Sequence, residues 1–112
     1  MMSEPPALRV SMPVCPSTNN LYRGRRFKTD FYKEWIERAE WVVKLQHHAR
    51  LAGRLRVVIE APFNLKRDLD NIKPALDLLV TLGLIDGDNR IDDLHIRRVP
   101  AGGAMTVSVW PM

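Results

Sequence analysis

The chain has 112 residues, of which 46% are hydrophobic, and a formal net charge of +4. Chains of roughly 100 to 150 residues most often form one domain, so we expect a single domain over residues 1–112. No apolar run approaches the roughly 18 to 20 residues of a membrane span, and the first residues lack the basic and apolar segments of a signal peptide, so we expect a cytoplasmic protein without membrane contact. The single cysteine, Cys15, excludes an internal disulfide and a cysteine-based metal cluster.

The first half of the chain predicts a strand, a loop, a long helix and a second strand. Residues 8–14 alternate apolar and polar side chains, as a half-buried strand does, whereas residues 15–29 are rich in polar side chains and arginines, which are typical of a loop. Apolar residues recur at helical spacing over residues 30–52, which predicts a helix that a glycine ends. These apolar positions are Phe31, Trp35, Ala39, Val42 and Val43. Residues 55–62 alternate again and predict the second strand.

The second half of the chain predicts a short helix followed by two strands. Residues 74–82 are mostly good helix formers, and Pro74 lies in the first turn, where its missing N–H is not needed. Residues 91–98 and 104–110 indicate two strands joined as a hairpin by the glycine-rich residues 101–103. The predicted order is strand, helix, strand, helix, strand, strand, which indicates an α+β fold in which two helices pack on a small mixed β-sheet.

Basic residues gather in short stretches around the acidic part of the chain. A basic protein attracts polyanions, of which nucleic acid is the most abundant in a cytoplasm. Net charge is weak evidence because many basic proteins do not bind DNA, but acidic groups set among basic arms are typical of an enzyme that cuts a phosphodiester. We therefore expect the basic stretches to bind DNA. Their residues are Arg23, Arg25, Arg26 and Lys28, followed by Lys66 and Arg67.

The sequence RDLDN at residues 67–71 directly follows the second predicted strand. If this segment stays extended, the carboxylates of Asp68 and Asp70 point the same way and lie roughly 7 Å apart, because side chains alternate with a period of two. Such carboxylates repel each other, and a divalent cation that prefers oxygen ligands, such as Mg²⁺, removes the repulsion. Asp88, in the loop after the second predicted helix, supplies a third oxygen if that loop returns to the strand end. The alternative interpretation is an acidic turn with a helix cap, since Asp and Asn are common before helices.

Lys73 lies at the start of the second predicted helix, where the helix dipole disfavours a cation by roughly 0.3 to 1 kcal/mol. A lysine at this position needs an anionic partner, which is either the aspartates of the predicted metal site or a phosphate. Asp77, four residues later, is the structural alternative, although a lysine that precedes an acid at this spacing is the weaker orientation.

These acidic and basic residues resemble the signature of the RusA family of Holliday-junction resolvases. In that family Asp-x-Asp-Asn precedes a lysine and an aspartate on a helix, and an acidic loop then leads into a strand. The matching residues here are Asp68, Asp70, Asn71, Lys73, Asp77 and Asp88. The sequence PSTNNLYR at residues 16–23 also resembles the family's first loop, so the similarity spans nearly the whole chain. The chain departs from the family in having one residue fewer before the lysine, and in having Gly87 where an additional aspartate is common.

The resemblance implies a magnesium-dependent, homodimeric endodeoxyribonuclease that resolves four-way (Holliday) DNA junctions by paired symmetric nicks. It implies that Asp68, Asp70 and Asp88 bind Mg²⁺ and act in catalysis together with Lys73. Two alternatives stay open. One is a nuclease of the same fold that acts on other branched DNA, and the other is a non-catalytic DNA-binding protein whose acidic cluster is a structural ion site.

The positions of two tryptophans and of two further aspartates can also be predicted. Trp35 and Trp41 are six residues apart on the predicted helix and do not share a face, and we expect core and dimer contacts for them in preference to base stacking. Asp92 and Asp93, at the start of a predicted strand, are expected to face solvent.

Overall fold

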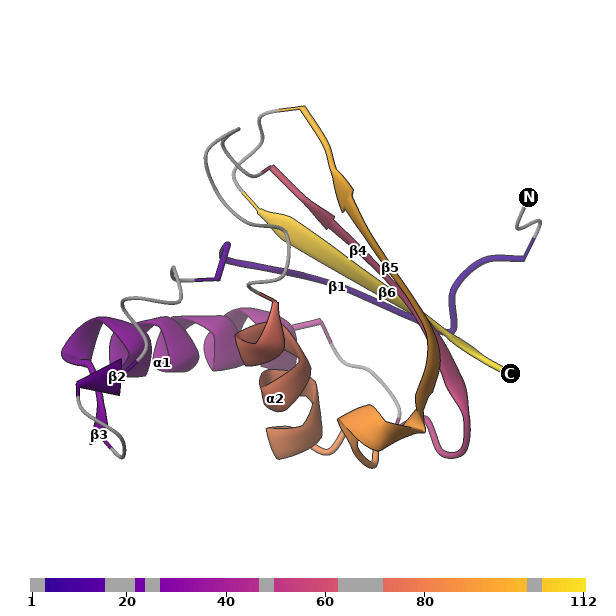
Figure 1. Ribbon diagram of the computed structural model, residues 1–112, viewed down its shortest axis with the longest axis horizontal. Helices are drawn as coiled ribbons and strands as arrows, with labels where there is room; N and C mark the ends of the chain where they lie inside the picture. Colours follow the sequence, from indigo (N-terminus) through magenta and orange to yellow (C-terminus); the bar gives the residue numbers. More distant parts are fainter. Residues whose placement is uncertain (1–3, 16–21, 24–26, 47–49, 63–71, 101–103) are drawn as a thin grey trace.

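The computed structural model describes residues 4–15, 22–23, 27–46, 50–62, 72–100 and 104–112. Two helices pack against a four-stranded mixed sheet (Figure 1). The strands of this sheet are β1 (Leu8–Met12), β4 (Leu55–Ala61), β5 (Ile91–Arg98) and β6 (Met105–Pro111). The helices are α1 (Asp30–Lys44) and α2 (Lys73–Thr81), and a 3₁₀ turn, η2 (Asp88–Arg90), precedes β5. The predicted α+β fold and the predicted order of its main elements are confirmed.

The strand order in the sheet is β1-β6-β4-β5, with β6 antiparallel to both of its neighbours and β4 parallel to β5. The predicted hairpin between the last two strands is therefore wrong, because β4 lies between them. A parallel pair needs a crossover connection, and the segment through α2 provides it between β4 and β5. Side chains of β5 are half-buried or exposed, which suits the edge of the sheet, whereas β4 and β6 bury most of theirs.

The predicted loop before α1 contains a short antiparallel pair of strands, β2 (Tyr22–Arg23) and β3 (Phe27–Lys28). The next residue, Thr29, caps α1, because its hydroxyl accepts a hydrogen bond of 3.1 Å from the Tyr32 N–H.

The prediction that α1 extends to residue 52 is wrong, since the helix ends at Lys44. The Gln46 side chain accepts a hydrogen bond from the Ser11 N–H at 3.0 Å and donates one to the Ser11 carbonyl at 2.9 Å. These bonds fasten the end of α1 to β1. Leu51 then pairs with Ile85 in a parallel bridge, so the chain has left the helix before the predicted glycine stop.

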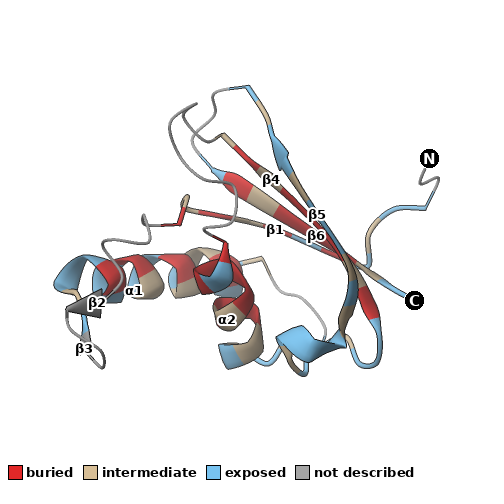
Figure 2. Ribbon diagram, in the orientation of Figure 1, coloured by how far each residue is buried: buried red, intermediate tan, exposed pale blue. Residues whose placement is uncertain are grey.

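The core lies between the helices and the sheet (Figure 2). Alternation predicted the inward side of the strands correctly for seven positions, which are buried: Leu8, Val10, Met12, Leu55, Val57, Ile59 and Ala61. Val14, which the alternation also predicts to face inward, lies beyond the end of β1 and is half-buried. On α1, Trp35, Ala39 and Val43 are buried as predicted, but Phe31 is 58% exposed and Tyr32, at 4%, takes its place. Tyr32 continues the spacing of three and four residues that the buried positions follow, so it shares their face. Cys15 is also buried. In the part of the chain that the structure describes, no helix is long and apolar enough to cross a membrane.

Candidate active site

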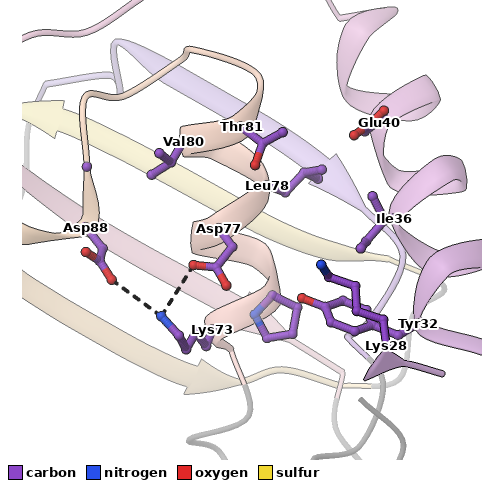
Figure 3. A pocket seen from close by; sticks show the side chains of 12 residues that line it. Lys28, Tyr32, Ile36, Glu40, Lys73, Asp77, Leu78, Val80, Thr81 and Asp88 are labelled. Atoms are coloured by element: carbon purple, nitrogen blue, oxygen red, sulfur yellow. Dashed lines mark hydrogen bonds and ion pairs between the residues drawn. The ribbon is translucent and has the colours of Figure 1, made fainter. Parts of the chain in front are cut away.

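A cleft of about 540 Å³ lies where α1, α2 and the turn before β5 approach one another (Figure 3). Helix α1 contributes Tyr32, Ile36 and Glu40 to its wall, and α2 contributes residues from Lys73 onward. Gly87 and Asp88 close the third side. The cleft is therefore assembled from segments that are distant in the sequence, and it contains side chains of both charges.

The Lys73 ammonium lies between two carboxylates from different elements. Its Nζ is 3.4 Å from Asp77 Oδ1, one helical turn along α2, and 3.8 Å from Asp88 Oδ2, on η2 (Figure 3). All three side chains are exposed, so each pair contributes at most about 1 kcal/mol to stability. Lys73 therefore has an anionic partner under both interpretations: Asp88 of the predicted site, and Asp77, the structural alternative.

The local sequence explains why Lys73 forms ion pairs with these carboxylates. Ile72, at the N-cap of α2, has no side-chain oxygen to cap the helix, and no acidic residue lies in the first turn. The positive end of the helix dipole therefore lies beside the Lys73 cation without a local anion. Asp88 brings negative charge to this end of the helix from the following turn.

The segment before Asp88 is held in place by the chain that leads into β4. The Leu51 N–H donates a 2.8 Å hydrogen bond to the Leu84 carbonyl. The Arg50 guanidinium binds the Asp86 carboxylate, with Nε 2.9 Å from Oδ1. These contacts fix the backbone two residues before Asp88.

The segment after Asp88 is held by Arg54. Its Nε donates to Asp92 Oδ2 at 2.9 Å, and its Nη1 lies 3.5 Å from the Asn89 carbonyl. The hydrogen bond from Arg54 holds the pKa of the Asp92 carboxyl below its usual value. Arg50 and Arg54 thus fasten the chain on both sides of Asp88, and no local sequence signal pointed to either arginine.

The acidic residues of β5 are engaged along the sheet and do not line the cleft. Asp93 accepts a 2.8 Å hydrogen bond from Arg56 Nε, and its other oxygen lies 3.0 Å from His95 Nε2. The prediction that Asp92 and Asp93 face solvent holds only in part, because each is about one-third exposed and paired with an arginine.

The structure places only some of the predicted site residues. Asp88, Lys73 and Lys28 line the cleft, and Lys28 Nζ also lies 6.0 Å from the centre of the Tyr32 ring. Arg23 lies in β2, and the other predicted residues lie outside the described residues: Asp68, Asp70, Arg25, Arg26, Lys66 and Arg67. Within the described ranges, no three His, Cys, Asp or Glu side chains form a metal site.

The chain matches no family model, but several known proteins are similar to it over most of its length. The crossover junction endodeoxyribonuclease RusA of Enterobacteria phage HK97 is 31% identical in an alignment of 101 residues that covers 81% of this chain and 84% of the relative. The proteins of the same name from Shigella sonnei strain Ss046 and Escherichia coli strain K12 are each 27% identical in an alignment of 112 residues that covers 92% of this chain and 93% of the relative. The chain therefore belongs to the RusA family of crossover junction endodeoxyribonucleases.

Proposed function

We propose that this chain is a magnesium-dependent endodeoxyribonuclease that resolves four-way DNA junctions by paired symmetric nicks. Membership of the family supports the hydrolysis of phosphodiester bonds in DNA, since the relatives are named crossover junction endodeoxyribonucleases. A four-way junction has approximate two-fold symmetry. A homodimer with two sites related by one axis matches that symmetry, so we propose that two copies act together.

The observation that carries the metal proposal is the Lys73 ammonium between Asp77 and Asp88. Asp77 and Asp88 pair with a cation here although the helix dipole disfavours one, and carboxylate oxygens are the hard donors that Mg²⁺ prefers. Asp70 precedes Lys73 by three positions in the sequence, so the peptide chain limits their Cα separation to roughly 11 Å. We propose that Asp68, Asp70 and Asp88 hold Mg²⁺. When bound, the ion supplies an activated water and stabilises negative charge on the phosphate oxygens.

Three residues of the chain have separate roles in this proposal. Asp88, whose neighbours Asp86 and Asp92 bind Arg50 and Arg54, presents a carboxylate to the cleft. Lys73, whose side chain is 72% exposed, has a flexible stem that lets its ammonium leave the two carboxylates and meet the scissile phosphate. Lys28, on another wall of the same cleft, offers a second cation to the DNA backbone.

The direct test is a synthetic four-way junction labelled on each strand in turn. We expect cuts in two strands of like polarity in the presence of Mg²⁺, and intact junction after chelation with EDTA. A flap or fork cut as fast as the junction would favour the alternative of a nuclease for other branched DNA. A junction that is bound but never cut, in Mg²⁺ or in Mn²⁺, would contradict the proposed activity.

The basic stretch of Arg23, Arg25, Arg26 and Lys28 provides a separate prediction about binding. Replacing Arg25 and Arg26 with alanine should weaken junction binding on any sequence, because phosphate contacts carry no base information. The slope of log affinity against log salt concentration should become shallower by roughly one unit per lost contact.

The matched control removes two exposed arginines from the sheet, as Arg9→Ala with Arg97→Ala. Fluorescence anisotropy over a series of salt concentrations measures both variants. An unchanged slope for the Arg25 and Arg26 variant, or an equal change in the control, would show that this stretch makes no specific contribution to DNA binding.

A further inference from the structure

Different sides of α1 have different surroundings. Trp35 and Ala39 are buried in the core, whereas Trp41 is 70% exposed. The expectation of a core contact therefore holds for Trp35 but is wrong for Trp41. Ile36 and Glu40 line the cleft, and because they are four residues apart they share one side of the helix. This side of α1 faces α2 across the cleft (Figure 3).

The part of the cleft between the two helices has apolar walls and a polar end. The apolar side chains come from both helices, and the polar end is formed by Glu40 on α1 and Thr81, the last residue of α2 (Figure 3). We call the residues Ile36, Glu40, Pro74, Leu78 and Thr81 the helix groove. The whole cleft, at about 540 Å³, lies within the range of roughly 300 to 1,000 Å³ in which proteins bind small ligands.

The other end of the helix groove meets two cations. Lys73 is the first residue of α2, and Lys28 lies two residues before the start of α1 (Figure 3). The start of a helix favours a phosphate, and the two ammonium groups add to this attraction. Cations, apolar walls and hydrogen-bonding oxygens thus follow one another along the cleft. The phosphate, ring and polar edge of one nucleotide have the same order.

Glu40 is a carboxylate without a cation partner. It is half-buried, and in the part of the chain that the structure describes its side chain makes no ion pair or hydrogen bond. Such an anion repels phosphate, so in a cleft that receives DNA it requires a group that donates hydrogen bonds. The edge of an unpaired nucleobase provides these donors, while apolar side chains suit the faces of its ring.

The number of acceptors on Glu40 selects among the bases. A carboxylate has two oxygens that accept hydrogen bonds and no donor. Guanine presents two donors side by side on its base-pairing edge, the ring N1–H and the N2 amino group. Adenine and cytosine each have a ring nitrogen that accepts beside their amino group, and thymine has one donor between two carbonyls. Guanine is therefore the base that matches Glu40.

We propose that the helix groove binds one unpaired guanine of the junction, whose N1–H and N2 amino group donate to Glu40. The ring lies between Ile36 and Leu78. The proposal rests on the proposed function, since Lys28 and Lys73 then meet phosphates of the same strand, and it makes Glu40 a specificity-determining residue. Extrusion of a base is least costly where the base is already unpaired, as it can be at the branch point of a junction.

Junctions with one unpaired nucleotide at the branch point test the base preference. Four probes carry guanine, adenine, cytosine or thymine there, and fluorescence anisotropy in EDTA measures their binding without metal or cleavage. The wild-type chain should bind the guanine probe about tenfold more tightly than each of the others, because a bidentate contact discriminates by at least roughly this factor. A probe with inosine, which lacks the N2 amino group, should have an intermediate affinity. Equal affinities for the four bases would overturn the proposal.

Glu40→Gln should change which base is preferred. Glutamine has nearly the same shape but offers one acceptor and one donor, which match the edges of adenine and cytosine. The variant should therefore bind the adenine and cytosine probes at least as tightly as the guanine probe. The matched control is Glu37→Gln, which removes the same charge from an exposed position of α1 outside the cleft and should keep the guanine preference.

Circular dichroism checks that α1 stays helical in both variants. A Glu40→Gln chain that keeps the guanine preference, with all affinities shifted alike, would show that Glu40 acts only through its charge and would overturn the proposal. An equal loss of preference in Glu37→Gln would overturn it as well.

Cleavage in Mg²⁺ separates this proposal from the proposed function. A chain that cuts junctions but binds the four probes equally would exclude the guanine site and leave the proposed function intact. A chain whose base preference follows Glu40 but which cuts no junction would exclude the proposed function and leave the guanine site intact.

Discussion

Asp88→Asn should abolish junction cleavage while leaving junction affinity unchanged or higher. Asparagine keeps the size of the side chain and one oxygen but removes the negative charge that a divalent cation requires. Loss of groups that merely orient a metal ligand costs about 10- to 100-fold, so loss of a ligand should cost at least about 100-fold in cleavage rate. The Asp88 side chain is 53% exposed, so the substitution should leave the free energy of unfolding nearly unchanged. Removal of an anion from a DNA-binding cleft lowers the repulsion of phosphate, which explains the retained affinity.

The control for Asp88→Asn is Asp93→Asn, whose carboxylate binds Arg56 and His95 outside the cleft. It should cut at close to the wild-type rate, since a partly exposed ion pair contributes at most about 1 kcal/mol to stability. Asp68→Asn and Asp70→Asn should be inactive like Asp88→Asn. Rapid cutting of a saturated junction by Asp88→Asn in Mg²⁺ would exclude Asp88 as a ligand, and retained cutting by both other variants would exclude the whole metal assignment.

Most of the fold was predictable because the strands and helices carry their own periodicity. The alternation in residues 8–14 and 55–62 identified the buried side of β1 and β4 before any pairing was known. Strand pairing was not predictable in the same way. The glycine-rich connection before β6 favoured a hairpin, but the choice of partner depends on which strands bury both faces, and that is a property of the assembled sheet.

Part of the site was predictable for a similar reason. The position of Lys73 at a helix start carries a local electrostatic cost, so its need for an anion could be inferred from the chain alone. The arginines that fasten Asp88 could not be inferred, because Arg50 and Arg54 lie 36 and 38 residues from the aspartates that they bind. Only the folded chain brings such partners together. Asp68 and Asp70 remain predictions from the sequence, since they lie outside the described residues.

Lys73→Ala should lower the maximal cleavage rate by roughly 10²- to 10³-fold, the usual cost of removing one group that stabilises transition-state charge. The effect on binding should be much smaller, because other basic residues also contact the DNA backbone. The rate falls because negative charge on the phosphate oxygens grows during the reaction, and an ammonium at that point stabilises the transition state more than the bound substrate. Single-turnover cleavage of a saturated junction measures the rate, and anisotropy measures the affinity.

Two further variants separate this role from a structural one. If Lys73 serves only as the helix partner of Asp77, then Asp77→Ala should impair the enzyme as much as Lys73→Ala, and both effects should be small, since such pairs contribute about 0.3 to 0.5 kcal/mol. If Lys73 acts on the phosphate, Asp77→Ala releases the ammonium and should cut at or above the wild-type rate. Lys73→Arg keeps the charge on a planar group and should retain part of the activity. A Lys73→Ala enzyme that binds far more weakly but cuts normally at saturation would make this lysine a phosphate contact alone.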